Sequence, residues 1–119
     1  EDFATIMLGF EDQKVAIIAS NWVTPKKDRT FTAVCTEGTL NGDFITQEIR
    51  IDHGDATIIP RRQQFQEPLV LELQSFVDVI DGKRKQPVVT SIEATNVTKV
   101  AEAALLSSET GSPIYLELK

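Results

Sequence analysis

The sequence predicts an α+β protein with an open, mostly antiparallel β-sheet and two helices packed on one face of that sheet. Strand-like segments rich in β-branched and aromatic residues fill the first half of the chain. Two segments with apolar residues at helical spacing follow, and a short strand-like segment comes last. Strands first and helices afterwards is the order typical of α+β proteins.

The predicted strands are separated by short polar or glycine-containing turns. The first two strands form a hairpin around Glu11, Asp12 and Gln13, and Gly38 lies in the turn before the fourth strand. Residues 41–43 (Asn-Gly-Asp) predict a second turn or a bulge. The predicted strands cover residues 3–10, 14–24, 29–36, a fourth strand from about residue 39, and residues 45–52, 55–60 and 114–118.

Both predicted helices carry recognisable start and stop signals. Pro68 suits the first helical position, and Gly82 lies just past the end of the first apolar stripe. Thr90 and Glu93 match a capping box at the start of the second helix, and Gly111 ends it. The apolar stripes consist of Leu69, Leu73, Phe76, Val77 and Ile80 in the first helix and Val97, Val100, Ala101, Ala104 and Leu105 in the second.

The second strand of the hairpin is apolar on both faces. Val15, Ile17 and Ala19 point one way, and Ala16 and Ile18 point the other. An antiparallel sheet with one solvated face alternates more cleanly than this. We therefore expect another domain or another copy of the chain to cover the second face.

Length and composition predict one globular domain over residues 1–119. The chain is 41% hydrophobic and 25% charged, and this length can bury a core without disulfides or metal. Its single cysteine, Cys35, allows no disulfide framework and favours a reducing, cytoplasmic compartment. Because Cys35 lies within a predicted strand, we expect it to be a small buried residue.

The charge of the chain excludes some classes of partner. A net charge of -6 and a pI of about 4.7 are unfavourable for binding nucleic acid, which requires a basic surface. No apolar run approaches the roughly 18 residues of a membrane span. We expect neither a nucleic-acid partner nor a membrane span.

The common catalytic and cofactor motifs are missing from the sequence. There is no G-x-G-x-x-G dinucleotide fingerprint, P-loop or G-x-S-x-G elbow. The single histidine, His53, lies in a polar turn and cannot form a multi-histidine metal site. We therefore predict no catalytic, cofactor-binding or metal-binding residue in this chain.

The stretch I-I-A-S-N-W-V-T-P-K-K contains the candidate binding residues, Asn21, Trp22 and Lys26. As neighbours on a strand, Asn21 and Trp22 point to opposite faces. An aromatic ring beside an amide and a lysine suits a sugar or a phosphate group. The competing interpretation is that Trp22 is a core or interface residue with no ligand.

Several segments together resemble the C-terminal domain of the Gfo/Idh/MocA family of NAD(P)-dependent sugar oxidoreductases. The most specific are T-E-G-T-L and the ending A-L-x-S-x-x-T-G-x-P-I-Y-L. The hairpin segment A-S-N-W-V-T-P, the helix P-L-x-x-E-L-x-x-F-V-D-x-I-x-G and a Pro-Val pair occur in the same order. The matching segments are residues 19–25, 36–40, 68–82, 87–88 and 100–116.

The resemblance implies a substrate-binding and oligomerisation domain that works beside an N-terminal Rossmann domain holding NAD(P). The catalytic lysine of the family lies in a Glu-Lys-Pro motif that this chain lacks, and its Asp-x-x-x-His pattern does not fit His53, because Ile49 stands four residues before it. The chain also opens within a strand-like pattern, so we expect a fragment that lacks the Rossmann domain and is inactive by itself. The substrate is expected to be a sugar-type molecule, and a homo-oligomer is expected to form through the open sheet face.

Two further hypotheses remain open from the sequence. The chain can be a non-catalytic dimerisation domain, in which Asn21 and Trp22 make only protein contacts. It can also be a stand-alone ligand-binding domain with its own pocket. The sequence does not separate NAD from NADP, or a free sugar from inositol or a sugar nucleotide.

Overall fold

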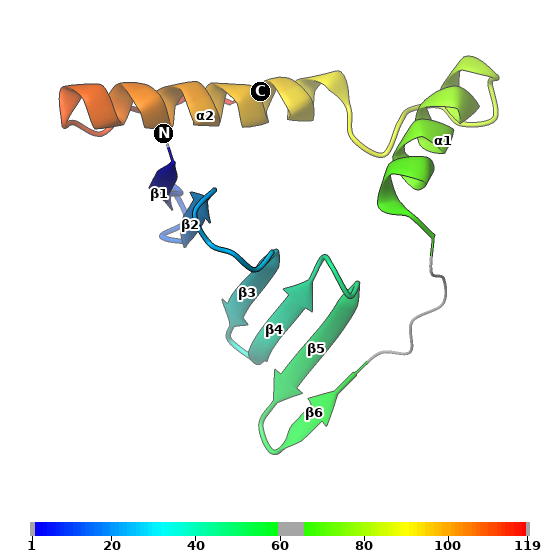
Figure 1. Cartoon of the computed structure of the whole chain (residues 1–119), viewed down its shortest axis with the longest axis horizontal. Helices are drawn as coiled ribbons and strands as arrows, with labels where there is room; N and C mark the ends of the chain where they lie inside the picture. The colour runs from blue at the N-terminus through cyan, green and yellow to red at the C-terminus, as the bar shows by residue number, and fades with distance from the viewer. Residues whose placement is uncertain (1, 60–65, 119) are drawn as a thin grey trace. The chain divides into compact units, whose positions relative to one another are not determined.

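A computed structural model describes residues 2–59 and 66–118 of the chain (Figure 1). The chain divides into two compact units, Glu1–Phe65 and Gln66–Lys119. All the strands of the described residues belong to the first unit, and both helices belong to the second. The α+β class and the antiparallel strand pairing are therefore confirmed, although the strands form two sheets and not one. The packing of the helices on a sheet face stays a prediction.

The first sheet is a two-stranded hairpin of β1 (Phe3–Gly9) and β2 (Val15–Asn21). Its turn is closed by the backbone N–H of Phe10, which donates to the Lys14 carbonyl at 2.9 Å. Gln13 adopts the left-handed conformation at φ 65°, which lets three residues reverse the chain. The hairpin forms where the sequence predicts it, but β2 ends at Asn21, and Trp22 already lies in a bend.

Apolar side chains occupy both faces of this hairpin. Cross-strand partners share a face, so Met7 and Ile17 lie on one side while Ile6 and Ile18 lie on the other. Met7 and Ile17 are the more exposed pair, at 72% and 67%. The prediction of two apolar faces is confirmed for β1 and β2.

The second sheet is an antiparallel meander in the order β3-β4-β5-β6. Its register runs through Thr32, Asn41 and Arg50, which lie side by side on three neighbouring strands. The strands are β3 (Thr30–Cys35), β4 (Gly38–Asp43), β5 (Glu48–His53) and β6 (Ala56–Ile58).

Unlike the hairpin, the four-stranded sheet is amphipathic, so the two apolar faces predicted from the second strand of the hairpin do not extend to it. One face carries the aromatic contact between Phe31 and Phe44, whose ring centroids are 5.4 Å apart. Leu40, Ile49 and Ile51 share this apolar face with Phe31 by register. The opposite, polar face consists of Thr30, Thr32, Val34, Thr39, Asn41, Asp43, Glu48, Arg50, Asp52 and Thr57.

Residues 41–43, predicted as a turn or bulge, belong to β4. The chain reverses after them, where Asp43 Oδ1 accepts the backbone N–H groups of Ile45 at 2.7 Å and Thr46 at 3.1 Å. Gln47 completes the reversal in a left-handed conformation at φ 58°. Gly42 can lie within the strand because the Phe31 ring occupies the space of a side chain, and its Cζ atom is 2.6 Å from the place of a Cβ atom.

Helix α1 (Pro68–Ile80) begins and ends as predicted. Pro68 lies in the first turn, and Gly82 takes φ 72° beyond the last helical residue. Ser75 is the buried polar side chain of this helix, only 5% exposed. Its Oγ accepts the backbone N–H of Val88 at 3.2 Å and Nη1 of Arg84 at 3.4 Å, which holds the following loop on the helix.

Helix α2 (Ser91–Thr110) confirms the predicted capping box and C-terminal glycine. The Glu93 carboxylate accepts the backbone N–H of Thr90 at 2.8 Å, and Thr90 Oγ1 accepts the Glu93 N–H at 3.3 Å. Gly111 ends the helix in the left-handed conformation at φ 66°. These bonds are local along the chain, which is why the sequence alone predicts them.

Two other predictions are wrong. Residues 114–118 form no strand, because their backbone pairs with none of the described strands. Cys35 is exposed and not buried, since it lies at the end of β3. More generally, no apolar side chain of the described residues is fully buried.

Candidate functional site

Asn21, the last residue of β2, organises the turn that follows the strand. Its Oδ1 accepts the backbone N–H of Thr24 at 2.8 Å and the Thr24 hydroxyl at 2.6 Å. Asparagine is suited to this position because its short side chain can replace a backbone acceptor in a turn. The amide oxygen is therefore committed to the fold, and the amide NH2 group is the part of Asn21 with which a ligand can be recognised.

Trp22 presents its ring at the surface directly after this strand end. Its side chain is 84% exposed, while its backbone N–H donates to the Asp2 carbonyl at 2.9 Å. The main chain is thus fixed by one more bond of the β1–β2 ladder. Within the first unit this exposure excludes a core role for Trp22, and the ligand and interface interpretations both stay compatible with it.

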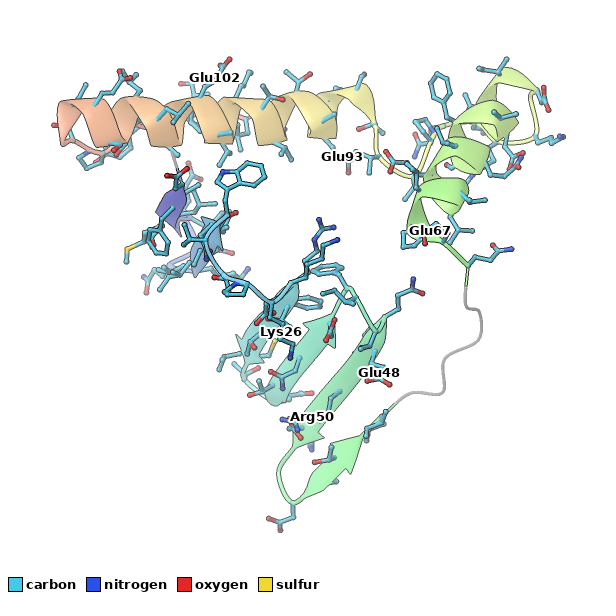
Figure 2. All side chains as sticks on the ribbon, in the orientation of Figure 1. Lys26, Glu48, Arg50, Glu67, Glu93 and Glu102 are labelled. Atoms are coloured by element: carbon cyan, nitrogen blue, oxygen red, sulfur yellow. The ribbon has the colours of Figure 1, made fainter. Side chains whose placement is uncertain are left out.

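Lys26 lies on the connection between β2 and β3, where Figure 2 labels it. It is exposed, as are Asn21 and Trp22. The three predicted residues therefore occupy one surface segment, residues 21–26, at the end of a strand. Their arrangement offers an aromatic ring, an amide donor and an ammonium group to a polar ligand.

A second group of polar side chains lies on the polar face of the four-stranded sheet. Asp52 is at its centre, because its carboxylate accepts the Thr57 hydroxyl at 2.7 Å and the Asn41 amide at 3.2 Å. Arg50 Nε pairs with the same carboxylate at 3.0 Å. Asn41 Oδ1 in turn accepts the Thr32 hydroxyl at 2.9 Å. This network crosses all four strands and fixes the rotamers of its members.

Beside this network the polar face is concave, with an open volume of about 340 Å³. Glu48 and Arg50, both labelled on β5 in Figure 2, contribute to its wall. None of Asn21, Trp22 and Lys26 lines this concavity. The lining residues are Thr30, Phe31, Thr32, Asn41, Gly42, Asp43, Glu48, Ile49, Arg50 and Ile59.

The sequence-based search missed this polar surface although a signal was present. Threonine, asparagine, aspartate, glutamate and arginine recur at every second position of β3, β4 and β5, with Val34 as the exception. That alternation places them on one face, but only the strand register shows which of them meet. Asn41 and Asp52 are eleven residues apart and come together solely because β4 and β5 pair.

Within residues 2–59 and 66–118, no helix is long and apolar enough to cross a membrane. The same described residues contain no group of three or more His, Cys, Asp or Glu side chains arranged to hold a metal ion. Comparison of the chain with protein-family models, curated proteins and solved structures found no match.

Proposed function

We propose that the chain is the C-terminal substrate-binding and oligomerisation domain of a cytoplasmic NAD(P)-dependent oxidoreductase that acts on a sugar or a sugar nucleotide. The resemblance of five ordered segments to the Gfo/Idh/MocA family motivates this proposal. The α+β class and the antiparallel strands are compatible with it.

The uncovered apolar surface is the structural observation that supports the proposal most. Met7 and Ile17 on the hairpin, and Ile58 on the apolar face of the second sheet, are all more than half exposed. Met7 and Ile17 are cross-strand neighbours, so they form an exposed apolar patch on one face of the hairpin, and exposed apolar patches mark interaction sites when they are large. Such a surface is expected of a domain that works against a Rossmann domain and a second copy of itself.

In this proposal the chain orients the substrate while the rest of the enzyme supplies the chemistry. NAD(P) would accept or donate the hydride, and the catalytic lysine of the family lies in the Rossmann half. In this proposal the Rossmann half holds the cofactor, and this chain carries no dinucleotide fingerprint. The Asn21 amide would donate to a substrate hydroxyl, the Trp22 ring would stack on an apolar sugar face, and Lys26 would attract an anionic group.

The test is steady-state kinetics of the intact enzyme on sugars and sugar nucleotides, with Trp22→Ala, Lys26→Ala and Asn21→Asp. Asn21→Asp is sharper than alanine because it keeps the oxygen that accepts both Thr24 groups, while it replaces the amide donor with a charged acceptor. Lys27→Ala is the matched control for Lys26. Selective loss of kcat/KM with unchanged oligomer mass supports the proposal. Unchanged kinetics in all three variants contradicts the substrate role.

A dimerisation domain without a substrate role is the second candidate, favoured by the two apolar faces of the hairpin. In that case Trp22→Ala changes the oligomer mass and leaves kcat/KM unaltered. A stand-alone ligand-binding domain is tested by thermal shift of the 119-residue chain with UDP-sugars, because a ligand that binds the folded state raises Tm.

A further inference from the structure

Each of the two sheets of the first unit has an edge strand without a charged residue or a proline that would block further strand pairing. β3 forms one edge of the four-stranded sheet, and β2 forms one edge of the hairpin, without a further strand among the described residues. Natural edge strands normally carry a charge, a proline or a bulge that blocks additional pairing. The sequence of β3, Thr-Phe-Thr-Ala-Val-Cys, contains no charge or proline, and its register with β4 is continuous.

The hydrogen bonds show which residues of β3 direct their backbone groups outward. The Phe44 N–H donates to the Arg29 carbonyl at 2.8 Å, so Arg29 belongs to the residues that bond to the β4 side. Bonding alternates along an antiparallel strand, which places Phe31, Ala33 and Cys35 in the same set. Thr30, Thr32 and Val34 therefore present their N–H and C=O groups at the free edge.

The same reasoning applies to β2. The Phe10 N–H donates to the Lys14 carbonyl, and the Trp22 N–H donates to the Asp2 carbonyl, both at 2.9 Å. Even-numbered residues of β2 thus bond to β1. Ile17, Ala19 and Asn21 present their backbone groups at the free edge.

We propose that the free edge of β2 pairs antiparallel with the free edge of β3 in the same chain, joining all six strands into one sheet. Residues 22–29 form the connection, with Asn21 opposite Thr30. This register aligns the outward groups of both strands and leaves no residue of β3 unpaired. The opposed outward pairs are Asn21–Thr30, Ala19–Thr32 and Ile17–Val34.

The faces of the joined sheet agree with this register. Ile18 comes beside Ala33 on the apolar face of the second sheet, and Ile17 comes beside Val34 on the opposite face. Val34 is the apolar exception among the β3, β4 and β5 residues of the polar face, and it is 82% exposed. Pairing places it next to the apolar Met7–Ile17 pair, which explains an otherwise misplaced valine. The inference goes beyond the proposed function and does not depend on it.

Amide hydrogen exchange of the unmodified 119-residue chain, resolved by NMR, tests the proposal directly. If the edges pair, the amides of Thr30, Thr32 and Val34 exchange at least about tenfold more slowly than the amides of an open edge. Their exchange rates are then close to those of the Phe31 and Ala33 amides. Fast exchange of these three amides, alternating with slow exchange of Phe31 and Ala33, would overturn it.

A disulfide test fixes the register and the identity of the partner strand. In a Cys35→Ser background, Ala19→Cys with Thr32→Cys should oxidise to an intramolecular disulfide, because directly opposed narrow pairs lie about 5.5 Å apart between Cα atoms. The control combines Ala19→Cys with Ala33→Cys, which lies on the other face, and should remain reduced. Disulfide-linked dimers would assign the edge to a second copy of the chain and overturn the intrachain pairing. Equal oxidation of the two double-cysteine variants would also overturn it.

Discussion

Replacement of Gly38 by alanine should destabilise the four-stranded sheet because a backbone group occupies the space for a side chain. A Cβ atom at Gly38 would collide with the carbonyl oxygen of Asp52 and lie 3.2 Å from its carbonyl carbon and 3.3 Å from the Cα atom of His53. Backbone atoms of a paired strand cannot swing aside as the end of a side chain can. Relief requires β4 and β5 to separate where Thr39 pairs with Asp52.

The cost follows from the bonds that this separation breaks. Two backbone hydrogen bonds at the Thr39–Asp52 position, at about 1 kcal/mol each, give a loss of about 2 kcal/mol. Gly9→Ala is the matched control, because no atom lies within 4 Å of its added methyl group. It should be neutral or slightly stabilising, since alanine restricts the unfolded chain more than glycine does.

Urea denaturation followed by circular dichroism gives the free energy of unfolding of both variants. Gly38→Ala should show a lower midpoint with an unchanged m value, whereas Gly9→Ala should match the unmodified chain. Equal stability of the two variants would refute the close approach between β4 and β5. A third variant, Gly54→Ala, distinguishes a steric clash of the added methyl group from strain of the backbone. Gly54 has φ 55°, but no neighbouring atom lies within 4 Å of an added Cβ atom. It should be destabilised by about 1 kcal/mol through conformational strain alone.

Three other outcomes are expected. Thr90→Ala should destabilise α2 by about 1 kcal/mol, measured as lost helicity by circular dichroism. The pKa of Glu93 is lowered from its ordinary value of 4.5 by hydrogen bonds from the Thr90 backbone and side chain. The stabilisation from Glu93 is therefore complete above pH 4.5 and is lost as the pH falls through the lowered pKa, a titration of helicity that Glu93→Gln should abolish. Ser75→Ala should leave the Val88 N–H without its acceptor, at a cost of about 1 to 2 kcal/mol, seen as faster amide exchange of Val88.

The elements that the sequence predicts correctly are those fixed by contacts close along the chain. Pro68, the Thr90–Glu93 capping box and Gly111 determine helix ends within one or two turns of themselves. The hairpin of β1 and β2 needs only a three-residue reversal and two strand-forming segments. In each case the interaction partners lie within a few residues, so their spacing is visible in the sequence.

The predictions that proved wrong concern residues whose structure depends on a neighbouring strand. Either that strand lies at a distance along the chain, or the described residues contain no such partner. Asn41-Gly42-Asp43 has the composition of a turn, yet the Phe31 ring on β3 makes the glycine a packing position within a strand. Residues 114–118 have the alternation of a strand, but a strand exists only where another edge accepts its bonds. Cys35 lies in a strand as predicted, but burial depends on what covers the strand.

The candidate binding residues show the same division. The sequence by itself determined that an amide, an aromatic ring and a lysine occur at the end of β2. Only the tertiary structure decided that the Asn21 oxygen is used by Thr24, and that Asp52 gathers Asn41, Arg50 and Thr57 on the polar face. The physical reason is that side-chain chemistry and local spacing are properties of the chain, whereas strand register sets which distant side chains meet.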